Sequence, residues 1–389
     1  MIFLKEFELK TKIFFGEEAL SRLLESKNRK VMIIADPFAV KSGLINCVTE
    51  KLEQSGAKYE IFDKVMPDPP TEAITVGVKA ALGMMPDCLM AVGGGSAMDF
   101  TKAVKKFAHD LDREFEPKFV AVPTTSGTGS EVTEVAVVTD SVKKVKYPLC
   151  SKELVPDEAI LDAVLVKTVP QNITADTGMD ILTHAIEAFV STGQNDFTDA
   201  LAERAVKLCS RYLLRSYSDS EDMEAKQKIH VASCMAGMAF TSAGLGLNHG
   251  MAHQLGAMFH IPHGRANAIL LPHIISYNSN ISDTTVPGDC YSSCERKYCE
   301  IASGIGIVNF DEVATVRSLM NYLKMLAKDM AMPSTVSEIG GIDREQYFSS
   351  IEAMTKAALE DTTTQTNPRV PKKEDIVLLY EKIWDNTAE

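Results

Sequence analysis

The chain has 389 residues, of which 45% are hydrophobic and 24% charged, so it has the composition of a folded globular protein and is long enough for two domains of ordinary size. Its net charge of −13 at pH 7 repels nucleic-acid backbones and anionic membranes, so neither is an expected partner. Charges interrupt every apolar run at the start of the chain, so no signal peptide or membrane span is expected there. The cysteines are mostly isolated, which fits a reducing compartment. The predicted location is the cytoplasm.

The first part of the chain alternates short runs rich in valine and isoleucine with helical patterns. The apolar runs cover residues 30–36, 58–65, 88–94, 118–124 and 158–162, and helical patterns cover residues 39–56 and 71–85. Alternating strands and helices predict a parallel sheet covered on both faces. Residues 134–140 and 143–151 are predicted to form a hairpin added to that sheet.

A glycine-rich turn follows the third of these runs. Gly93, Gly94, Gly95 and Ser96 separate the strand from a helix that is expected to begin near Ala97, with Asp99 in its first turn. The free N–H groups of a helix N-terminus attract anions, and glycine lets the backbone approach a phosphate closely. A plain tight turn is the alternative, but three consecutive glycines exceed what a turn requires. We therefore predict a phosphate site.

A second polar loop follows the next strand, over residues 123–133. It supplies hydroxyl groups from Thr124, Thr125, Ser126, Thr128 and Ser130. Ligands of open parallel sheets bind at the carboxyl ends of the strands, where both loops are expected. Two adjacent loops of this kind indicate one extended ligand with phosphate groups, such as a dinucleotide.

From about Asp176 onward the pattern becomes helical. Apolar residues at three-to-four spacing predict helices over residues 178–192, 199–218, 225–240, 315–330 and 374–386. The predicted fold is an α/β nucleotide-binding domain with a Rossmann-like parallel sheet, residues 1–176, followed by an all-α metal-binding domain, residues 177–389.

Half of the eight histidines fall in one short stretch, "HGMAHQLGAMFHIPH". These are His249, His253, His260 and His263. A helix upstream places Asp180 and His184 four residues apart on one face, and His249 and His253 repeat that spacing. A carboxylate with several imidazoles suits iron or zinc better than calcium or magnesium, which prefer oxygen ligands. Each pair alone could be incidental, and spacing alone does not assign the ligands.

Four segments resemble the signatures of the iron-containing (group III) alcohol dehydrogenases: "GGGSAMD", "PTTSGTGSEVT", "TGMDILTHAIEAF" and "HGMAHQLGAMFHIPHGRANAILLPH". They follow the order and spacing of that family along almost the whole chain. The resemblance implies that the metal ligands are Asp180, His184, His249 and His263. It places His253 near the nicotinamide, as the catalytic proton relay, and gives His260 no role.

The resemblance also implies the residues that contact the cofactor NAD(H). These are Gly94, Gly95, Ser96, Asp99, Thr124, Thr125, Ser130 and Lys146. Asp36, after the strand of residues 30–36, is expected to accept from a ribose hydroxyl and to disfavour NADP(H), or else to cap a helix before Pro37. Asp176 stands where many members carry a small or amide residue, which concerns the packing beside the site.

The implied activity is NAD(H)-linked interconversion of short primary alcohols and aldehydes, with Fe²⁺, or else Zn²⁺, as Lewis acid. "DFTDALAE", "GLGLNH" and "TNPR" most resemble propanol dehydrogenases of propanediol-utilisation microcompartments, so a microcompartment lumen is an alternative location and a homodimer or higher homo-oligomer is expected. Three alternatives stay open: a glycerol or diol dehydrogenase, a lyase of the dehydroquinate-synthase type, and a non-catalytic nucleotide-binding subunit.

Overall fold

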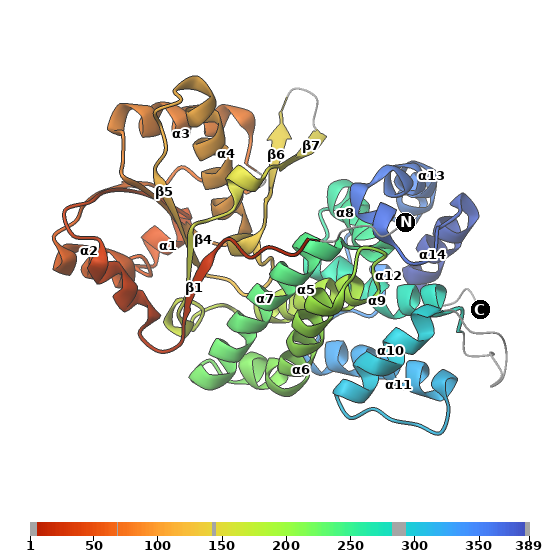
Figure 1. Ribbon diagram of the computed structural model, residues 1–389. Helices are drawn as coiled ribbons and strands as arrows, with labels where there is room; N and C mark the ends of the chain where they lie inside the picture. Colours follow the sequence, from red (N-terminus) through yellow and green to blue (C-terminus); the bar gives the residue numbers. More distant parts are fainter. Residues whose placement is uncertain (1–5, 68, 142–144, 282–292, 386–389) are drawn as a thin grey trace. The chain divides into compact units, whose positions relative to one another are not determined.

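The computed structural model describes residues 6–67, 69–141, 145–281 and 293–385. The chain forms two compact units (Figure 1). The first comprises Met1–Val169 together with Lys226–Thr241, and the second comprises Pro170–Ala225 together with Ser242–Glu389.

A six-stranded sheet, parallel throughout, forms the centre of the first unit, in the order β1-β8-β5-β4-β2-β3. Its strands are β1 (Lys12–Phe15), β2 (Lys30–Ala35), β3 (Lys58–Phe62), β4 (Cys88–Gly93), β5 (Lys118–Pro123) and β8 (Glu158–Leu161). The chain passes from β2 outward to β3 and then returns to the other side of β2 as β4. The carboxyl ends of β2 and β4 therefore flank the switch point at which such sheets bind ligands.

Helices cover both faces of this sheet (Figure 1). On one face, η1 (Ala19–Glu25) and α2 (Asn46–Ser55) pack leucine, isoleucine and valine side chains against β2, β4 and β5. On the other face, α3 (Thr71–Met84) and α4 (Gly95–Leu111) pack against β2 and β4. In each buried strand, the side chains that face one surface of the sheet and those that face the other are thus both apolar, which explains the unbroken apolar runs in the sequence.

Three details differ from the sequence prediction. Strands β6 (Val135–Asp140) and β7 (Val145–Cys150) do form a hairpin, but the hairpin is a separate two-stranded sheet and does not join the larger one. The buried Val138 of β6 packs into the apolar layer of α3 and α4, which holds the hairpin over the helices. The helical pattern of residues 39–56 is broken into α1 (Pro37–Lys41) and α2, because Gly43 adopts a φ of 76°. The edge strand β1 was not predicted.

The described residues of the second unit form helices and the loops between them, with no strand. Its helices are α5 (Gln171–Val190), α6 (Asp196–Ser218), α8 (Leu247–Phe259), α9 (His263–Ser279), α10 (Ser293–Gly304), α11 (Glu312–Asp329), α12 (Val336–Ile339), α13 (Arg344–Glu360), η5 (Thr362–Thr366) and α14 (Lys373–Asp385). A core of buried aliphatic and aromatic side chains joins α8, α9, α13 and α14. This core fixes the two helices, α8 and α9, that carry the clustered histidines.

Helix α7 (Met223–Ala243) contributes its middle part to the first unit. The predicted fold class, a parallel α/β unit plus a helical unit, is confirmed. Among the described residues, no single helix is both long and apolar enough to cross a bilayer, and only α7 and α8 taken together, as a bent pair, meet the length and composition criteria.

Candidate functional site

The glycine turn lies where β4 passes into α4 and has almost no space for side chains. A Cβ atom on Gly93, whose φ is 158°, would lie 2.6 Å from the Cβ of Ala97. A Cβ on Gly94 would lie 3.1 Å from Thr125 Oγ1, and one on Gly95 would lie 3.0 Å from Thr128 Cγ2. The glycine turn and the hydroxyl loop that follows β5 are therefore in contact, as expected for loops that follow neighbouring strands.

Asp99 and Ser130 tie the two loops together. The Ser130 hydroxyl donates to Asp99 Oδ1 at 3.1 Å, and Asp99 Oδ2 accepts from the backbone N–H of Val137 at 3.1 Å. Asp99, predicted to contact the cofactor, is thus also a link between α4 and the start of the hairpin.

A buried lysine that the sequence analysis did not single out lies beneath this loop. The Lys102 side chain is 0% exposed, and its Nζ donates to Ser130 Oγ, Thr133 Oγ1 and the carbonyl of Val135 at 3.0, 2.9 and 2.8 Å. Burial lowers the pKa of Lys102 to about 8, against the attraction of nearby carboxylates. All three hydrogens of the ammonium group have oxygen partners, so this cation holds the hydroxyl loop in one conformation.

The middle of α7 supports the same loop from within the first unit. A Cβ on Gly129, whose φ is 61°, would lie 2.6 Å from the Cα of Gly237, so the two backbones touch. Ser126 Oγ lies 2.9 Å from His230 Nδ1. Burial lowers the pKa of His230 to about 4, so its imidazole is neutral at pH 7 and makes an ordinary hydrogen bond with the hydroxyl.

Of the other residues predicted to bind the cofactor, Asp36, Ser96 and Thr124 lie at the same edge of the sheet, and Lys146 lies on the separate hairpin. Asp36 follows β2, and its side chain accepts from the N–H of Phe38 at 2.7 Å, so it does cap α1. Ser96 lies in the first turn of α4. Thr124 lies beside the glycine turn, because its backbone N–H donates to the Gly93 carbonyl at 3.0 Å. Lys146 lies on β7, and its side chain falls outside the described part of the chain.

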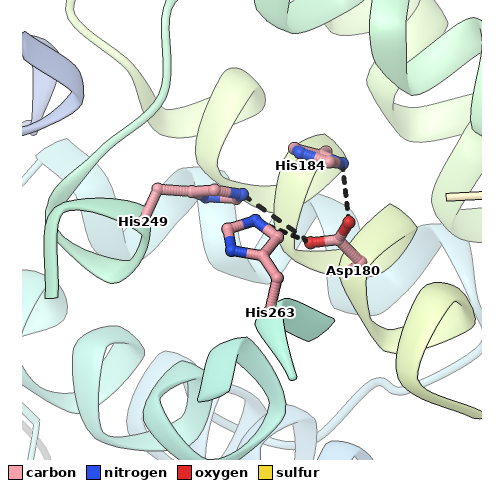
Figure 2. Close-up of side chains that lie close together, drawn as sticks. All are labelled: Asp180, His184, His249 and His263. Carbon is pink, nitrogen blue, oxygen red and sulfur yellow. Dashed lines mark ion pairs between the residues drawn. The ribbon is translucent and has the colours of Figure 1, made fainter. Parts of the chain in front are cut away.

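The second unit brings together the four residues predicted as metal ligands. One ligand atom from each of Asp180, His184, His249 and His263 lies within 4.8 Å of the others. Figure 2 shows the three imidazoles arranged around the carboxylate of Asp180. Asp180 and His184 lie on α5, His249 on α8 and His263 at the start of α9, so three helices meet at this point.

Close helix contacts create this meeting point. A Cβ on Gly264 would lie 1.9 Å from the carbonyl oxygen of Asp176, so α9 touches the backbone of α5 immediately beside His263. Asp176 also accepts two hydrogen bonds from the Arg265 guanidinium, at 3.1 and 3.0 Å. The unusual residue noted at position 176 therefore packs α5 against α9 as half of an ion pair.

The distances within the cluster suit a bound ion. Asp180 Oδ1 lies 3.4 Å from His263 Nε2 and 3.8 Å from His249 Nε2, and Asp180 Oδ2 lies 4.0 Å from His184 Nδ1. Two ligand atoms that are each about 2.1 Å from one tetrahedral ion lie roughly 3.4 Å apart. The donor set, three imidazoles and one carboxylate, is that of a first-row transition metal.

Two buried carboxylates place negative charge on either side of His249. Glu187 Oε2 lies 2.5 Å from His249 Nδ1, which leaves Nε2 facing Asp180. Burial alone would lower the pKa of His249, but the carboxylates outweigh burial and raise the pKa to about 9. Burial alone would raise the pKa of Asp180, but the imidazoles of His184, His263 and His249 outweigh burial and keep that pKa well below its usual range. The site therefore favours positive charge between Asp180 and His249, as a proton or as a metal ion.

Asn267 provides a second sign that a cation fits here. Its Nδ2 lies 2.7 Å from Asp180 Oδ1 and 3.2 Å from the Nε2 atoms of both His249 and His263. An amide nitrogen has two hydrogens and cannot satisfy three acceptors. When Nε2 of His249 carries no proton, the converging lone pairs exceed the two hydrogens of Asn267, so the arrangement fits an added cation, either a proton on His249 or a divalent ion.

The remaining two histidines of the stretch lie differently. The ring of His253 stacks on that of His263 with centroids 5.4 Å apart, and its Nδ1 lies 2.8 Å from Asp361 Oδ2. His260 is exposed, ends α8 with a φ of 55°, and is not part of the metal cluster.

Sequence reasoning did not find the residues that support this site. Glu187 lies three residues after His184 and seven after Asp180 on one helix face, so its spacing was a usable signal. Asn267 follows His263 by one helical turn. Lys102 looked like any surface lysine of an amphipathic helix, and Asp361 is too distant in sequence from His253 for any spacing to connect them.

Comparison with known proteins gives two family matches that together cover most of the chain. Residues 10–163 match the model of the iron-containing alcohol dehydrogenases, and residues 174–384 match that of the C-terminal part of the Fe-containing alcohol dehydrogenase family.

Curated relatives extend over the whole chain. It is 40% identical to the 1-propanol dehydrogenase PduQ of Citrobacter freundii, over 98% of this chain and 100% of the relative. It is 37% identical to the NADPH-dependent butanol dehydrogenase of Clostridium saccharobutylicum, over 98% of each chain.

Solved structures share the fold. A 1,3-propanediol oxidoreductase matches with a TM-score of 0.87 at 30% identity, over 98% of this chain and 100% of that one. The sulfoacetaldehyde reductase of Bifidobacterium kashiwanohense, solved with NAD⁺, matches with a TM-score of 0.84 at 26% identity, over 98% and 99%.

The metal content of alanine variants should show which of the four clustered histidines bind the ion. His249→Ala and His263→Ala should each lose the ion, because either change removes one of four ligands and leaves an open coordination position. His253→Ala should keep the ion, and His260→Ala serves as the matched control from the same stretch. Elemental analysis of anaerobically purified variants measures the outcome. A His253 variant without metal, or a stoichiometric His249 or His263 variant, would contradict this assignment.

Glu187 should hold His249 in the orientation that presents Nε2 to the ion. Glu187→Gln removes the charge that fixes the ring and should weaken metal affinity by roughly 10–100-fold. Competition with a chelator gives the affinity. Glu203→Gln, which removes an exposed partner of Lys207 in the same unit, should leave the affinity unchanged. Equal affinities for Glu187→Gln and the unmodified protein would show that Glu187 does not orient the ligand.

Proposed function

This chain belongs to the iron-containing alcohol dehydrogenase family, and from that premise we propose that it interconverts short-chain primary alcohols and aldehydes with NAD(H). The proposed metal is Fe²⁺, with Zn²⁺ as the alternative, bound by Asp180, His184, His249 and His263. The propanol and butanol dehydrogenases among its relatives support propanol- and propanal-like substrates.

Each part of the proposed reaction has residues that would carry it. A divalent ion supplies Lewis acidity, which lowers the pKa of an alcohol and polarises a carbonyl. The glycine turn and the hydroxyl loop would bind the pyrophosphate and ribose groups through backbone N–H and side-chain O–H groups. His253, beside the metal cluster with 40% of its side chain exposed, would take the hydroxyl proton during oxidation and return one during reduction.

The observation that carries this proposal is the convergence of one carboxylate and three imidazoles from three helices in a chain that matches the family along its length. Anaerobic purification with elemental analysis, followed by NADH oxidation with aldehydes of two to four carbons, tests it. We expect a stoichiometric transition metal and turnover of propanal. A metal-free protein that consumes no NADH with any of these aldehydes would refute the proposal.

A diol or glycerol dehydrogenase is the second candidate, favoured by the similarity to a solved 1,3-propanediol oxidoreductase. The same assay with 1,3-propanediol, 1,2-propanediol and glycerol in the oxidation direction distinguishes the two. The first candidate requires a higher kcat/KM for 1-propanol than for any of these polyols. A non-catalytic subunit would not need to keep an intact ligand set, whereas all four positions are filled here.

We also propose a homodimer or higher homo-oligomer, located in the cytoplasm or in the lumen of a bacterial microcompartment. Light scattering of the purified protein tests the first statement, and cell fractionation tests the second.

Asp36 should set the preference for NAD(H) if its charge faces the ribose. Because Asp36 also caps α1, Asp36→Asn is the informative change: it keeps the capping oxygen and removes only the charge. The ratio of kcat/KM for NADH to that for NADPH should then fall by about tenfold or more, since a carboxylate repels the 2′-phosphate. Asp36→Gly removes cap and charge together. An unchanged ratio in Asp36→Asn would leave Asp36 with its capping role alone.

A further inference from the structure

His253 has a carboxylate partner that comes from a different part of the second unit. Asp361 lies between the end of α13 and the start of η5, and its Oδ2 is 2.8 Å from His253 Nδ1. The other carboxylate oxygen, Oδ1, accepts from the backbone N–H and the hydroxyl of Thr363 at 2.9 and 2.8 Å. Each oxygen of Asp361 therefore has a separate partner, and the carboxylate cannot rotate without losing three hydrogen bonds.

The segment that carries Asp361 is fixed against α8. One helical turn before His253, a Cβ on Gly250 would lie 2.1 Å from Thr364 Oγ1, so η5 presses directly against the helix. The Thr364 hydroxyl in turn donates to the Ala358 carbonyl at 2.7 Å. This packing holds the carboxylate in place next to His253.

Two further hydrogen bonds join the start of α8 to the same segment. The Thr366 hydroxyl donates to the Leu245 carbonyl at 2.7 Å, and the backbone N–H of Leu247 donates to Asn367 Oδ1 at 3.1 Å. Residues 361–367 and 245–253 are thus joined by close packing and by hydrogen bonds. The distance between Asp361 and His253 is set by backbone packing on both sides and not by two mobile side chains.

The charge state of Asp361 suits an acceptor role. Burial raises its pKa, but the hydrogen bonds from His253 and Thr363 outweigh burial and lower the pKa below its usual range. An ionised carboxylate accepts only, so His253 must donate from Nδ1. In the neutral ring, Nε2 is then the nitrogen with a free lone pair, and no hydrogen bond to it occurs among the described residues.

We propose that Asp361 is the positioning residue for His253: it accepts the Nδ1–H, fixes the tautomer and orientation of the ring, and leaves Nε2 to exchange the substrate proton. This inference rests on the proposed function. In alcohol oxidation the hydroxyl proton would pass to Nε2, the C–H hydrogen would leave with its electron pair to NAD⁺, and the carbonyl double bond would form. His253 would then release the Nε2 proton to solvent, while the Nδ1–H stays with Asp361.

A double-mutant cycle tests whether Asp361 acts through His253. Asp361→Ala should lower kcat by roughly 10–100-fold, with metal content and the KM for NADH unchanged. In the His253→Ala background, whose own kcat should be roughly 10²-fold or more below that of the unmodified enzyme, the same change should have less than about a twofold effect. Asp361→Asn keeps an acceptor oxygen and should lose less than Asp361→Ala.

Asp343→Ala is the matched control, because Asp343 caps the other end of α13 by accepting from the N–H of Gln346 at 2.8 Å. It should lower thermal stability without lowering kcat. Equal losses from Asp361→Ala in both backgrounds, or a kcat for Asp361→Ala within twofold of the unmodified enzyme, would overturn the proposal. A purely structural role predicts the first of these results, since the cost would not depend on His253.

A measurement without turnover separates this inference from the proposed function. In zinc-loaded protein labelled with ¹⁵N-histidine, the His253 signal, assigned by its loss in His253→Ala, should show a protonated Nδ1 and a bare Nε2 at a pH where the ring is neutral. Asp361→Ala should shift the proton to Nε2, the form that neutral imidazole prefers in water. If no alcohol or aldehyde is turned over, the proposed function fails while the tautomer still decides the role of Asp361; an unchanged tautomer in Asp361→Ala refutes that role.

Discussion

Two buried carboxylates, Asp180 and Glu187, need positive charge or hydrogen-bond donors nearby, and the packing of the helical unit meets this need. They lie about two turns apart on α5, and His249 lies between them with one ring nitrogen facing each. Buried negative charge is costly unless positive charge or hydrogen-bond donors neutralise it. The unit meets this requirement by bringing α8 and α9 onto α5, with Gly264 allowing the backbones to touch. A divalent ion bound at the centre, as proposed above, would complete the neutralisation, and metal binding would then depend on the same packing of three helices.

The α/β unit uses a buried cation in a comparable way. Lys102 holds the hydroxyl loop through two hydroxyl oxygens and the start of β6 through a carbonyl oxygen, and Asp99 links the loop to the helix that follows the glycine turn. Neither side chain needs to touch a ligand for this arrangement to matter. A loop whose hydroxyl groups are held in place binds phosphates and sugars at a lower entropic cost than a mobile one. The backbone contact between Gly129 and Gly237 limits the loop from its other side.

His253 and His249 each pair through Nδ1 with a carboxylate outside the metal cluster, but only His249 belongs to that cluster. His249 is oriented by Glu187 so that Nε2 points toward Asp180, whereas His253 is oriented by Asp361. A carboxylate that accepts from Nδ1 therefore orients a proposed metal ligand in one case and a proposed proton relay in the other. What distinguishes the two imidazoles is burial: the side chain of His249 is 1% exposed, and that of His253 is 40% exposed and open to exchange with solvent.

The sequence by itself determined the features that depend on neighbours along the chain. The unbroken apolar runs gave the strands, the three-to-four spacing gave the helices, and the glycine turn gave the place where β4 meets α4, because each of these patterns is local. The sequence also predicted that side chains four residues apart on one helix, such as Asp180 and His184, lie on the same face. Only the tertiary structure decided that the hairpin of β6 and β7 stands apart from the main sheet, that the middle of α7 packs with the first unit, and that Lys102 is buried. It also joined Asp361 to His253 across 108 residues. Those outcomes depend on which surfaces meet after the helices and strands have formed, and no periodicity within a segment encodes the identity of its partner.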